Sequence, residues 1–412
     1  MTNPLKTAES QEPGNMPPND GYITPEPTKP SQSLSGLLLL AATIAAMIWA
    51  NSAVSDSYHG LWEAPIIGAV SLHHVINDAL MSLFFLMVGL EIKFELQAGA
   101  LASFRLAALP IVGAIGGMLL PAAIYSSIAI GTPAAHGWGI AMATDIAFAI
   151  GVMAILGKRV PAGLRVFLAA LAIADDLGAV LVIGLFYTST ISLAALAAVL
   201  IVMSLLILCN RKSVQNPWVY MALGVLLWIA VQQSGVHASI AGVLLAFTIP
   251  ARGISSVEYK IEHALQFPVS YAIIPLFALA NAGVVLPENL FTLAGDKAMQ
   301  ATALGLVIGK PLGISGAAWL AVRAGWASLP GDATWYGLFA VSVLGGIGFT
   351  MSLFVANLAF DAGPHVDAAK LGILAGSLTA GVLGTLFLIH QHHVNTRKPG
   401  GLAGSGNPAA QS

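Results

Sequence analysis

Two adjacent carboxylates, Asp175 and Asp176, interrupt an apolar stretch that runs from about residue 162 to 186. A helix of that length crosses the roughly 30 Å hydrocarbon core of a bilayer, which places the pair near its centre. A charged side chain at that depth costs about 2.5–3.5 kcal/mol on insertion scales, and intramembrane acids usually mark functional sites. We therefore interpret the pair as an ion or proton site. The alternative is a pair of neutral, hydrogen-bonded carboxyls in the protein core.

The composition of the 412-residue chain indicates a polytopic membrane protein. Hydrophobic residues make up 57% of the chain and charged residues 9%, whereas soluble domains carry roughly 25% charged residues. The single cysteine, Cys209, excludes an internal disulfide, a cysteine zinc cluster and an iron–sulfur site. The net charge of -2 gives no indication of nucleic acid. Membrane lipids are the expected partners, and no cofactor is expected.

Twelve apolar runs of spanning length predict an all-α polytopic fold of twelve transmembrane helices. Their approximate bounds are 34–50, 75–94, 104–125, 133–155, 162–187, 194–210, 217–231, 235–248, 259–283, 300–321, 337–360 and 367–390. They form one membrane domain over 34–392. The flanking tails, 1–33 and 393–412, are rich in proline or polar residues and are predicted to be disordered. No cleavable signal peptide is visible.

Lysine and arginine placement orients these spans, because basic residues concentrate in cytoplasmic loops. With an internal N-terminus, 14 of the 17 basic residues fall on the side that holds both termini. Both termini are therefore predicted to be cytoplasmic. Lys297 and Lys370 fall on the opposite side, and Lys310 lies within a span. The loop 51–74 is then external, and alternating residues within it allow a short hairpin.

Three other spans carry polar residues or glycines at the same depth as the aspartate pair. These are Thr144 and Asp145, then Lys310, then Gly345, Gly346 and Gly348. Sodium and lithium are hard cations that prefer oxygen ligands, so one aspartate can hold a cation while the other pairs with Lys310. Burial disfavours the charged forms of these groups, so they can also exchange protons. A carboxylate that binds either a proton or a cation is the minimum requirement for antiport.

The glycine segment predicts a broken helix, since it weakens helical continuity. Unpaired backbone groups at that depth must face protein or a cavity. The ends of a broken helix carry partial charges, and Asp145 can offset the positive N-terminal ends while Lys310 offsets the negative C-terminal ends. Tight helix packing through small residues is the alternative interpretation of this segment. The residues of the span 133–155 predict no second break.

Seven segments resemble the bacterial NhaA sodium/proton antiporters: LAIADDLGA (171–179), ATDIAF (143–148), GLEIK (89–93), INDALM (76–81), PLFALANAG (275–283), GKPLG (309–313) and GIGFTMS (346–352). The resemblance extends from about residue 37 to 390. It implies an electrogenic inner-membrane exporter of sodium or lithium that admits protons by alternating access, a secondary transporter rather than an enzyme. Spans three to five and ten to twelve start on opposite sides, which permits an inverted repeat of the kind NhaA itself exemplifies. The resemblance also implies a homodimer held partly by the external 51–74 loop.

The resemblance gives each mid-membrane centre a role. Asp176 would be the principal cation and proton site, and Asp175 would exchange a salt bridge with Lys310 during the cycle. Thr144 would lie beside this site. Asp145 would lie where the broken fourth and eleventh helices cross, which implies a second helix break at Thr144 and Asp145.

The resemblance further implies a cytoplasmic pH-sensing cluster of Glu91, Lys93, Glu95, Glu262 and His263. The chain departs from the family pattern beside this cluster, because Phe94 and Gln266 stand where a basic residue and a histidine are typical, so the pH of activation is open. His237 is linked to pH response in the family, or is simply a hydrogen-bonded interfacial histidine. Asp78 is either part of a cation funnel or a solvated helix end.

Other classes of membrane protein also place acids within membrane spans. An intramembrane aspartyl protease gives Lys310 no role, and its Gly-x-Gly-Asp pattern is absent from the sequence. A passive cation channel uses a ring of acids or carbonyls, usually from several subunits. Same-fold transporters of organic anions, such as bile-acid-type symporters, are the nearest alternative.

Overall fold

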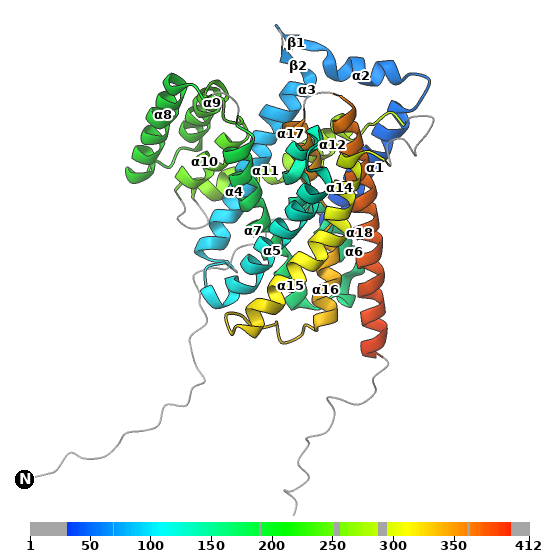
Figure 1. Cartoon of the computed structure of the whole chain (residues 1–412). Coiled ribbons are helices and arrows are strands. Elements are labelled where there is room, and N and C mark those ends of the chain that lie inside the picture. Colours follow the sequence, from blue (N-terminus) through cyan, green and yellow to red (C-terminus); the bar gives the residue numbers. More distant parts are fainter. Residues whose placement is uncertain are drawn as a thin grey trace, which may run out of the picture.

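The computed structural model describes residues 31–68, 70–99, 101–188, 191–250, 256–286, 295–360 and 363–396. These residues are almost entirely helical, and Figure 1 shows the helices gathered into one bundle. The predicted disordered tails fall largely outside the described residues. Helix α1 (Gln32–Ala50) begins slightly before the predicted domain boundary, and α18 (Pro364–Thr396) ends slightly beyond it.

Eight helices are long and apolar enough to cross a membrane. Five of them are single helices: α1, α5 (Phe104–Ala129), α7 (Ala162–Phe186), α8 (Leu193–Arg211) and α18. The other three are continuous helices made of three elements each: α3 (Leu72–His74), η1 (Val75–Leu80) and α4 (Met81–Gln97); α11 (Val257–Pro268), η4 (Val269–Ile273) and α12 (Ile274–Asn281); and α14 (Lys297–Leu304), η5 (Gly305–Gly309) and α15 (Lys310–Arg323). The chain is thus a multi-pass membrane protein, as its composition predicted.

Two more spans are formed by bent helix pairs. They are η2 (Pro133–Met142) with α6 (Ile146–Leu156) and η3 (Gly157–Arg159), bent by 41°, and α16 (Trp335–Leu344) with α17 (Phe349–Ala359), bent by 49°. With these pairs the described residues hold up to ten spans. The other two predicted spans correspond to α9 (Pro217–Gln233) and α10 (Ile240–Thr248), which have 17 and 9 residues. Both are shorter than the roughly 20 residues that cross a bilayer, so twelve spans are not confirmed.

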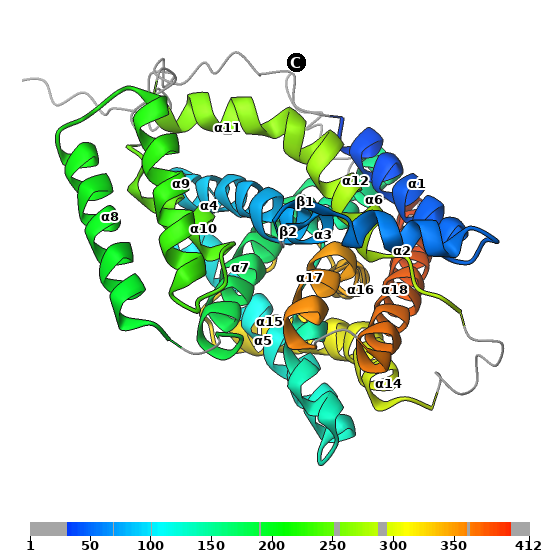
Figure 2. The same cartoon turned by 90° about the horizontal axis from the view of Figure 1, so that it is seen from above.

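Two large apolar cores hold most of the described bundle together. The smaller one joins α8, α9 and α10 to α4 and α11, and its central side chains, Leu206, Tyr220 and Leu227, are fully buried. Figure 2 shows α8 at the edge of the molecule with α9 beside it. The larger core fills the rest of the bundle around α7 and α16. Because lipid chains are as apolar as leucine, close packing rather than exclusion of water stabilises these contacts within a bilayer.

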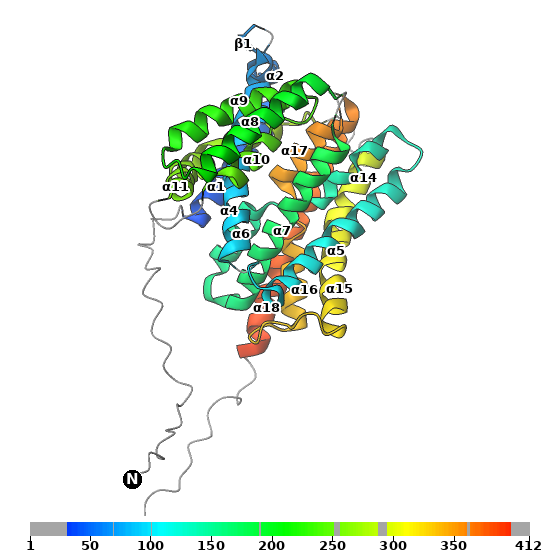
Figure 3. The same ribbon diagram turned by 90° about the vertical axis from the view of Figure 1, so that its left-hand side faces the viewer.

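Close approach of α5 and α15 positions Lys310. The two helices lie side by side (Figure 3), and a Cβ atom at Gly116 would lie 2.3 Å from the carbonyl oxygen of Gly313. A Cβ at Gly313 would lie 2.2 Å from the carbonyl oxygen of Gly116. Glycine at both positions therefore lets the backbones touch. Lys310 lies one turn before Gly313 and is fully buried.

The 51–74 loop contains the predicted hairpin. Strand β1 (Pro65–Ile67) pairs antiparallel with β2 (Val70–Ser71). The loop also contains a helix that the sequence analysis missed, α2 (Ser55–Glu63). Tyr58 anchors α2 to the end of α12, because its hydroxyl donates to the Leu279 carbonyl at 2.8 Å and accepts the Gly283 N–H at 3.1 Å.

Candidate ion-binding site

The aspartate pair lies at the middle of α7, with each residue 1% exposed. The ammonium nitrogen of Lys310 donates to Asp175 Oδ2 at 2.7 Å, and neither side chain of this pair is exposed. The structure therefore brings together two of the predicted site residues. Removing one partner of such a buried pair leaves an uncompensated charge, so the pair is costly to break.

Asp176 has no comparable partner. Both of its carboxyl oxygens are buried, and neither accepts a hydrogen bond from any described residue. Consecutive helical residues point about 100° apart, so Asp176 faces away from the direction of Asp175 and Lys310. A buried carboxylate without donors is stable only when it holds a proton or a cation. The described residues contain no cluster of three or more His, Cys, Asp or Glu side chains suited to a metal ion, so a cation here also needs hydroxyl, carbonyl or water oxygens.

Thr144 and Asp145 lie in the break between η2 and α6. The Asp145 N–H donates to the Ile347 carbonyl at 2.7 Å, and the Thr144 hydroxyl donates to the Gly345 carbonyl at 2.8 Å. Both acceptors lie in the break between α16 and α17, so the two breaks are hydrogen-bonded to each other. Thr144 also lies close to Asp175, which connects the breaks to the aspartate pair.

The carboxylate of Asp145 caps two helices. Its Oδ1 accepts the Phe148 N–H at 2.9 Å at the start of α6. Its Oδ2 accepts the Thr350 N–H at 3.1 Å and the Thr350 hydroxyl at the start of α17. A negative charge at two helix N-termini offsets their partial positive charges. Lys310 bonds Asp175 and not the carbonyls at the breaks, so its role at the C-terminal ends stays a prediction.

The break between α16 and α17 falls within the predicted glycine segment. A Cβ at Gly346 would lie 2.5 Å from the Leu306 carbonyl oxygen, and one at Gly348 would lie 2.1 Å from the Ser352 hydroxyl. The glycines thus permit close packing in addition to the break, and both interpretations of this segment apply. Ser352, which the sequence analysis did not single out, donates to the Ile140 carbonyl of η2 at 2.7 Å.

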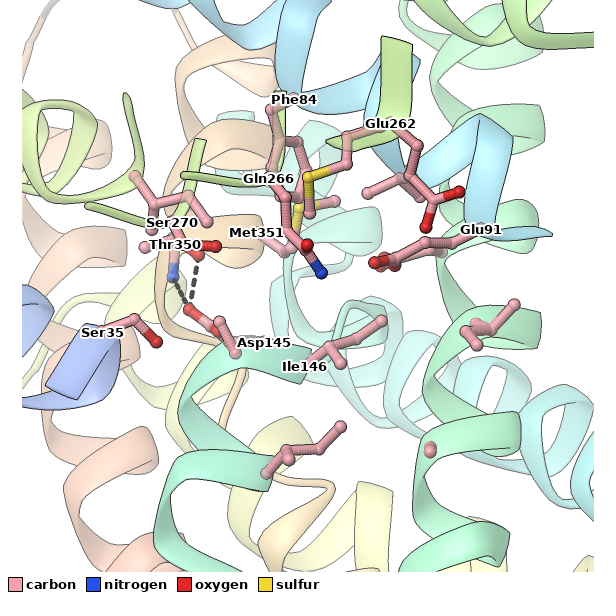
Figure 4. Close-up of a pocket in the computed structure, with 18 of the residues that line it drawn as sticks. Ser35, Phe84, Glu91, Asp145, Ile146, Glu262, Gln266, Ser270, Thr350 and Met351 are labelled. Carbon is pink, nitrogen blue, oxygen red and sulfur yellow. Dashed lines mark hydrogen bonds between the residues drawn. The ribbon is translucent and has the colours of Figure 1, made fainter. Parts of the chain in front are cut away.

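A cavity of about 370 Å³ reaches Asp176. Asp145, Thr350 and Met351 line it together with three acids of the predicted pH-sensing cluster: Glu91, Glu95 and Glu262. Figure 4 shows Glu91 and Glu262 across the cavity from Asp145 and Thr350. Asp175 and Lys310 are not among the lining residues. One aspartate of the pair therefore lies on the cavity lining and the other does not.

The rest of the predicted pH-sensing cluster lies outside the cavity lining. Lys93 is 6% exposed, and its nitrogen donates to the carbonyls of Ala246 and Ile249 at the end of α10 and lies 3.4 Å from Glu258 Oε1 of α11. Glu258 is a buried partner that the sequence analysis missed, because its contact depends on the packing of three helices. His263 is exposed beside Tyr259.

The two residues that depart from the family pattern, Phe94 and Gln266, both line the cavity. The Phe94 ring is 54% exposed. The cavity lining therefore carries aromatic and amide groups at the positions where the family pattern places basic and histidine side chains.

His237 and Asp78 lie together and are not among the cavity-lining residues. His237 Nε2 lies 3.7 Å from Asp78 Oδ1, and its Nδ1 lies 3.0 Å from the Ser239 hydroxyl. His74 Nε2 lies 2.9 Å from Asp78 Oδ2. The contacts match the interpretation of His237 as a hydrogen-bonded histidine, and a role for it in pH response stays a prediction. Asp78 is shielded by the two histidines.

Sequence comparisons identify the family of the chain. The family model described as Na+/H+ antiporter 1 matches residues 28–388. A curated protein named Na(+)/H(+) antiporter NhaA from Koribacter versatilis is 44% identical, with 89% of this chain and 91% of the relative covered. One of the same name from Vibrio cholerae is 49% identical over 86% of this chain and 94% of the relative. Na(+)/H(+) antiporter NhaA 1 of Pseudomonas savastanoi is 48% identical, covering 87% and 93%. The chain therefore belongs to the NhaA-type Na+/H+ antiporter family.

Proposed function

We propose that this protein exports sodium or lithium in exchange for entering protons, electrogenically and by alternating access. The relatives are named as Na+/H+ antiporters, which move ions across a membrane rather than transform a substrate. The observation that carries the proposal is Asp176, a buried carboxyl without a hydrogen-bond donor that lines the cavity. Such a group alternates between two occupants of equal charge, a proton and an alkali cation.

The pairing of Asp175 with Lys310 supports electrogenic exchange. An electrogenic cycle returns more protons than it exports cations, so it needs more than one proton-binding group. Asp175, Asp176 and Lys310 supply three groups within one buried cluster. When a cation draws Asp175 toward Asp176, Lys310 loses its partner and can release a proton. When the cation leaves, the Lys310 bond to Asp175 forms again.

Regulation by pH is proposed to act through the acidic lining of the cavity. Glu91, Glu95 and Glu262 line the same cavity as Asp176, and Glu91 and Glu262 lie near each other on one side of it (Figure 4). The negative charge of these acids sets the local concentration of cations, and this charge decreases as the acids bind protons. The positions of Phe94 and Gln266 on this lining set the pH at which the change occurs.

We also propose an inner-membrane homodimer with cytoplasmic termini, in which the β1–β2 hairpin contributes to the contact between subunits. Two short strands expose edges that can pair with a second copy.

The test uses proteoliposomes with an acidic lumen and a pH-sensitive dye. NaCl, LiCl or KCl is added at external pH values from about 6 to 9, the range in which histidine and perturbed carboxyls titrate. Sodium and lithium, but not potassium, are expected to collapse the gradient, and Asp176→Asn is expected to abolish this. Asp56→Asn, an exposed carboxylate on α2, is the matched control and should behave as wild type. If no alkali cation moves protons in wild type, the proposal fails and transport of an organic substrate becomes the hypothesis.

A further inference from the structure

The start of α17 lacks a cap of its own. Its N-cap residue is Gly348, which has no side chain to accept a hydrogen bond. The first amides of any helix have no partner within the helix, and in a buried position they need acceptors from elsewhere. Asp145 supplies one acceptor, for the Thr350 N–H. The adjacent amide, that of Phe349, is bonded by a different helix.

That bond comes from Ser377 on α18. The Phe349 N–H donates to the Ser377 hydroxyl oxygen at 3.1 Å, and Ser377 is 7% exposed. The two residues are 28 positions apart in the chain. α18 runs beside α16 and α17 (Figure 2), and it is the longest helix described, with 33 residues. Two neighbouring amides of α17 are thus held by two different segments, the N-cap of α6 and the helix α18.

The face of α18 that carries Ser377 is shaped for this contact. Ala380, Gly381 and Gly384 follow it at helical spacing, so all four lie on one face. A Cβ at Gly384 would lie 2.5 Å from the Leu344 side chain, and one at Gly381 would lie 3.6 Å from Ile347. The small residues therefore let α18 approach the break. Ser377 is the polar group on this face at the level where α17 begins.

We propose that Ser377 is a positioning residue for the ion site: by capping Phe349 from α18, it fixes the start of α17 so that Thr350 meets Asp145 and the two breaks stay aligned beside Asp175 and Asp176. The inference rests on the proposed antiport. Without the bond, the buried Phe349 amide has no acceptor, and the start of α17 must be ordered each time a cation binds. Cation affinity then falls, because ordering opposes binding.

The experiment measures sodium half-saturation and maximal rate in proteoliposomes, for wild type, Ser377→Ala, Ser377→Thr and Thr379→Ala. Thr379 is the matched control, because it is exposed on the same helix and its hydroxyl bonds only its own backbone, at Ala375. Ser377→Ala is expected to raise the half-saturating sodium concentration roughly fivefold to tenfold, the effect of one lost hydrogen bond, with a smaller change in maximal rate. Ser377→Thr retains the hydroxyl and should restore affinity.

A second readout is independent of transport. Hydrogen exchange followed by mass spectrometry on peptides covering 347–352 should show faster exchange of the Phe349 amide in Ser377→Ala, but not in Thr379→Ala. Unchanged sodium affinity together with unchanged exchange in Ser377→Ala overturns the inference. The inference is also overturned if Ser377→Ala loses sodium affinity, Ser377→Thr does not regain it and Thr379→Ala loses it as well.

Two further outcomes are separated by design. If Ser377→Ala does not accumulate in the membrane, Ser377→Cys takes its place, because a thiol is a weak acceptor of similar size and the same shifts are expected at smaller amplitude. If wild type moves no cation, the proposed antiport fails, and the exchange measurement alone still decides whether Ser377 holds the start of α17.

Discussion

Lys310 Nζ and Asp175 Oδ2 lie 2.7 Å apart in the middle of the bundle, and neither side chain has any exposed surface. Of the two adjacent aspartates, Asp176 is among the residues that line the cavity and Asp175 is not. Two adjacent residues of one helix therefore have different environments.

The Asp175–Lys310 pair should show strong coupling in a double-mutant cycle. Lys310→Met and Asp175→Asn each leave one buried group without its partner, so each is expected to lower the free energy of unfolding by about 3–5 kcal/mol. The double variant should lose less than the sum of the two. Unfolding in mixed detergent micelles measures these differences. Lys158→Met, at an exposed position in η3, is the control, and additive losses would contradict a direct pairing.

Replacing Asp145 should lower the free energy of unfolding more than replacing an ordinary helix cap. Asp145→Ala leaves the Phe148 and Thr350 amides without acceptors, at about 1–3 kcal/mol each. Asp145→Asn keeps one acceptor oxygen and should fall between alanine and wild type. Asp296→Ala removes a cap of one helix only: it accepts the Ala298 N–H at the start of α14 and also lies 3.4 Å from His365 Nδ1, and its loss should cost about 0.5–2 kcal/mol. Equal losses in unfolding free energy for the two alanine variants would rule out the double role.

A positive charge added to the cavity lining should weaken sodium binding. Phe94→Lys places an ammonium group among the cavity acids and should raise the half-saturating sodium concentration by about threefold at low ionic strength, since like charges repel. Raising the ionic strength with choline chloride should diminish the effect through screening. Leu96→Lys adds the same charge at a 42% exposed site of α4 that does not line the cavity. If both variants shift affinity equally, the charge does not act through the cavity.

Tyr58 should stabilise the protein in a pH-dependent way. Burial raises the pKa of Tyr58 from 10.0 to about 12, against the opposing effect of its hydrogen bond from Gly283. A raised pKa favours the protonated phenol, so this stabilisation is complete below pH 10 and is lost as the pH rises toward 12. Tyr58→Phe should lower the free energy of unfolding by about 1 kcal/mol near neutral pH. Thermal unfolding at increasing pH should show the stabilities of wild type and variant converging. A stability difference that stays constant with pH would contradict this prediction.

The hairpin should contribute to dimerisation without contributing to transport. Replacing strands β1 and β2 with a short glycine linker is expected to shift the protein toward monomers in chemical cross-linking and size-exclusion chromatography. Sodium-dependent proton movement should remain. A variant that stays fully dimeric would remove the hairpin from the proposed interface.

The sequence predicted the parts of the site that depend on composition and depth. Asp175, Asp176 and Lys310 were identified because charged residues stand out in apolar spans, and the break near Gly346 because glycine weakens helices. The break at Thr144 and Asp145 has no such glycine, and only the family resemblance implied it. The local signal was present, because Asp145 is a favoured N-cap residue immediately before an apolar run.

Two contacts between distant segments were missed by the sequence analysis. Glu258 meets Lys93, and Ser377 meets Phe349, only because helices pack in a particular register. The predicted number of twelve spans is not confirmed for a different reason: α9 and α10 are apolar but have only 17 and 9 residues. Helix α2 is amphipathic and polar on average, so an analysis based on apolar runs passed over it.

Because one carboxylate of Asp145 holds the starts of both α6 and α17, the two half-helices share a common pivot. Rotation of either half-helix about its break strains the hydrogen bond that Asp145 makes with the other half-helix. Independent movements of the two are therefore opposed, and a concerted movement is favoured. The candidate site at Asp176 therefore lies beside one mechanical unit built from two chain segments more than 200 residues apart.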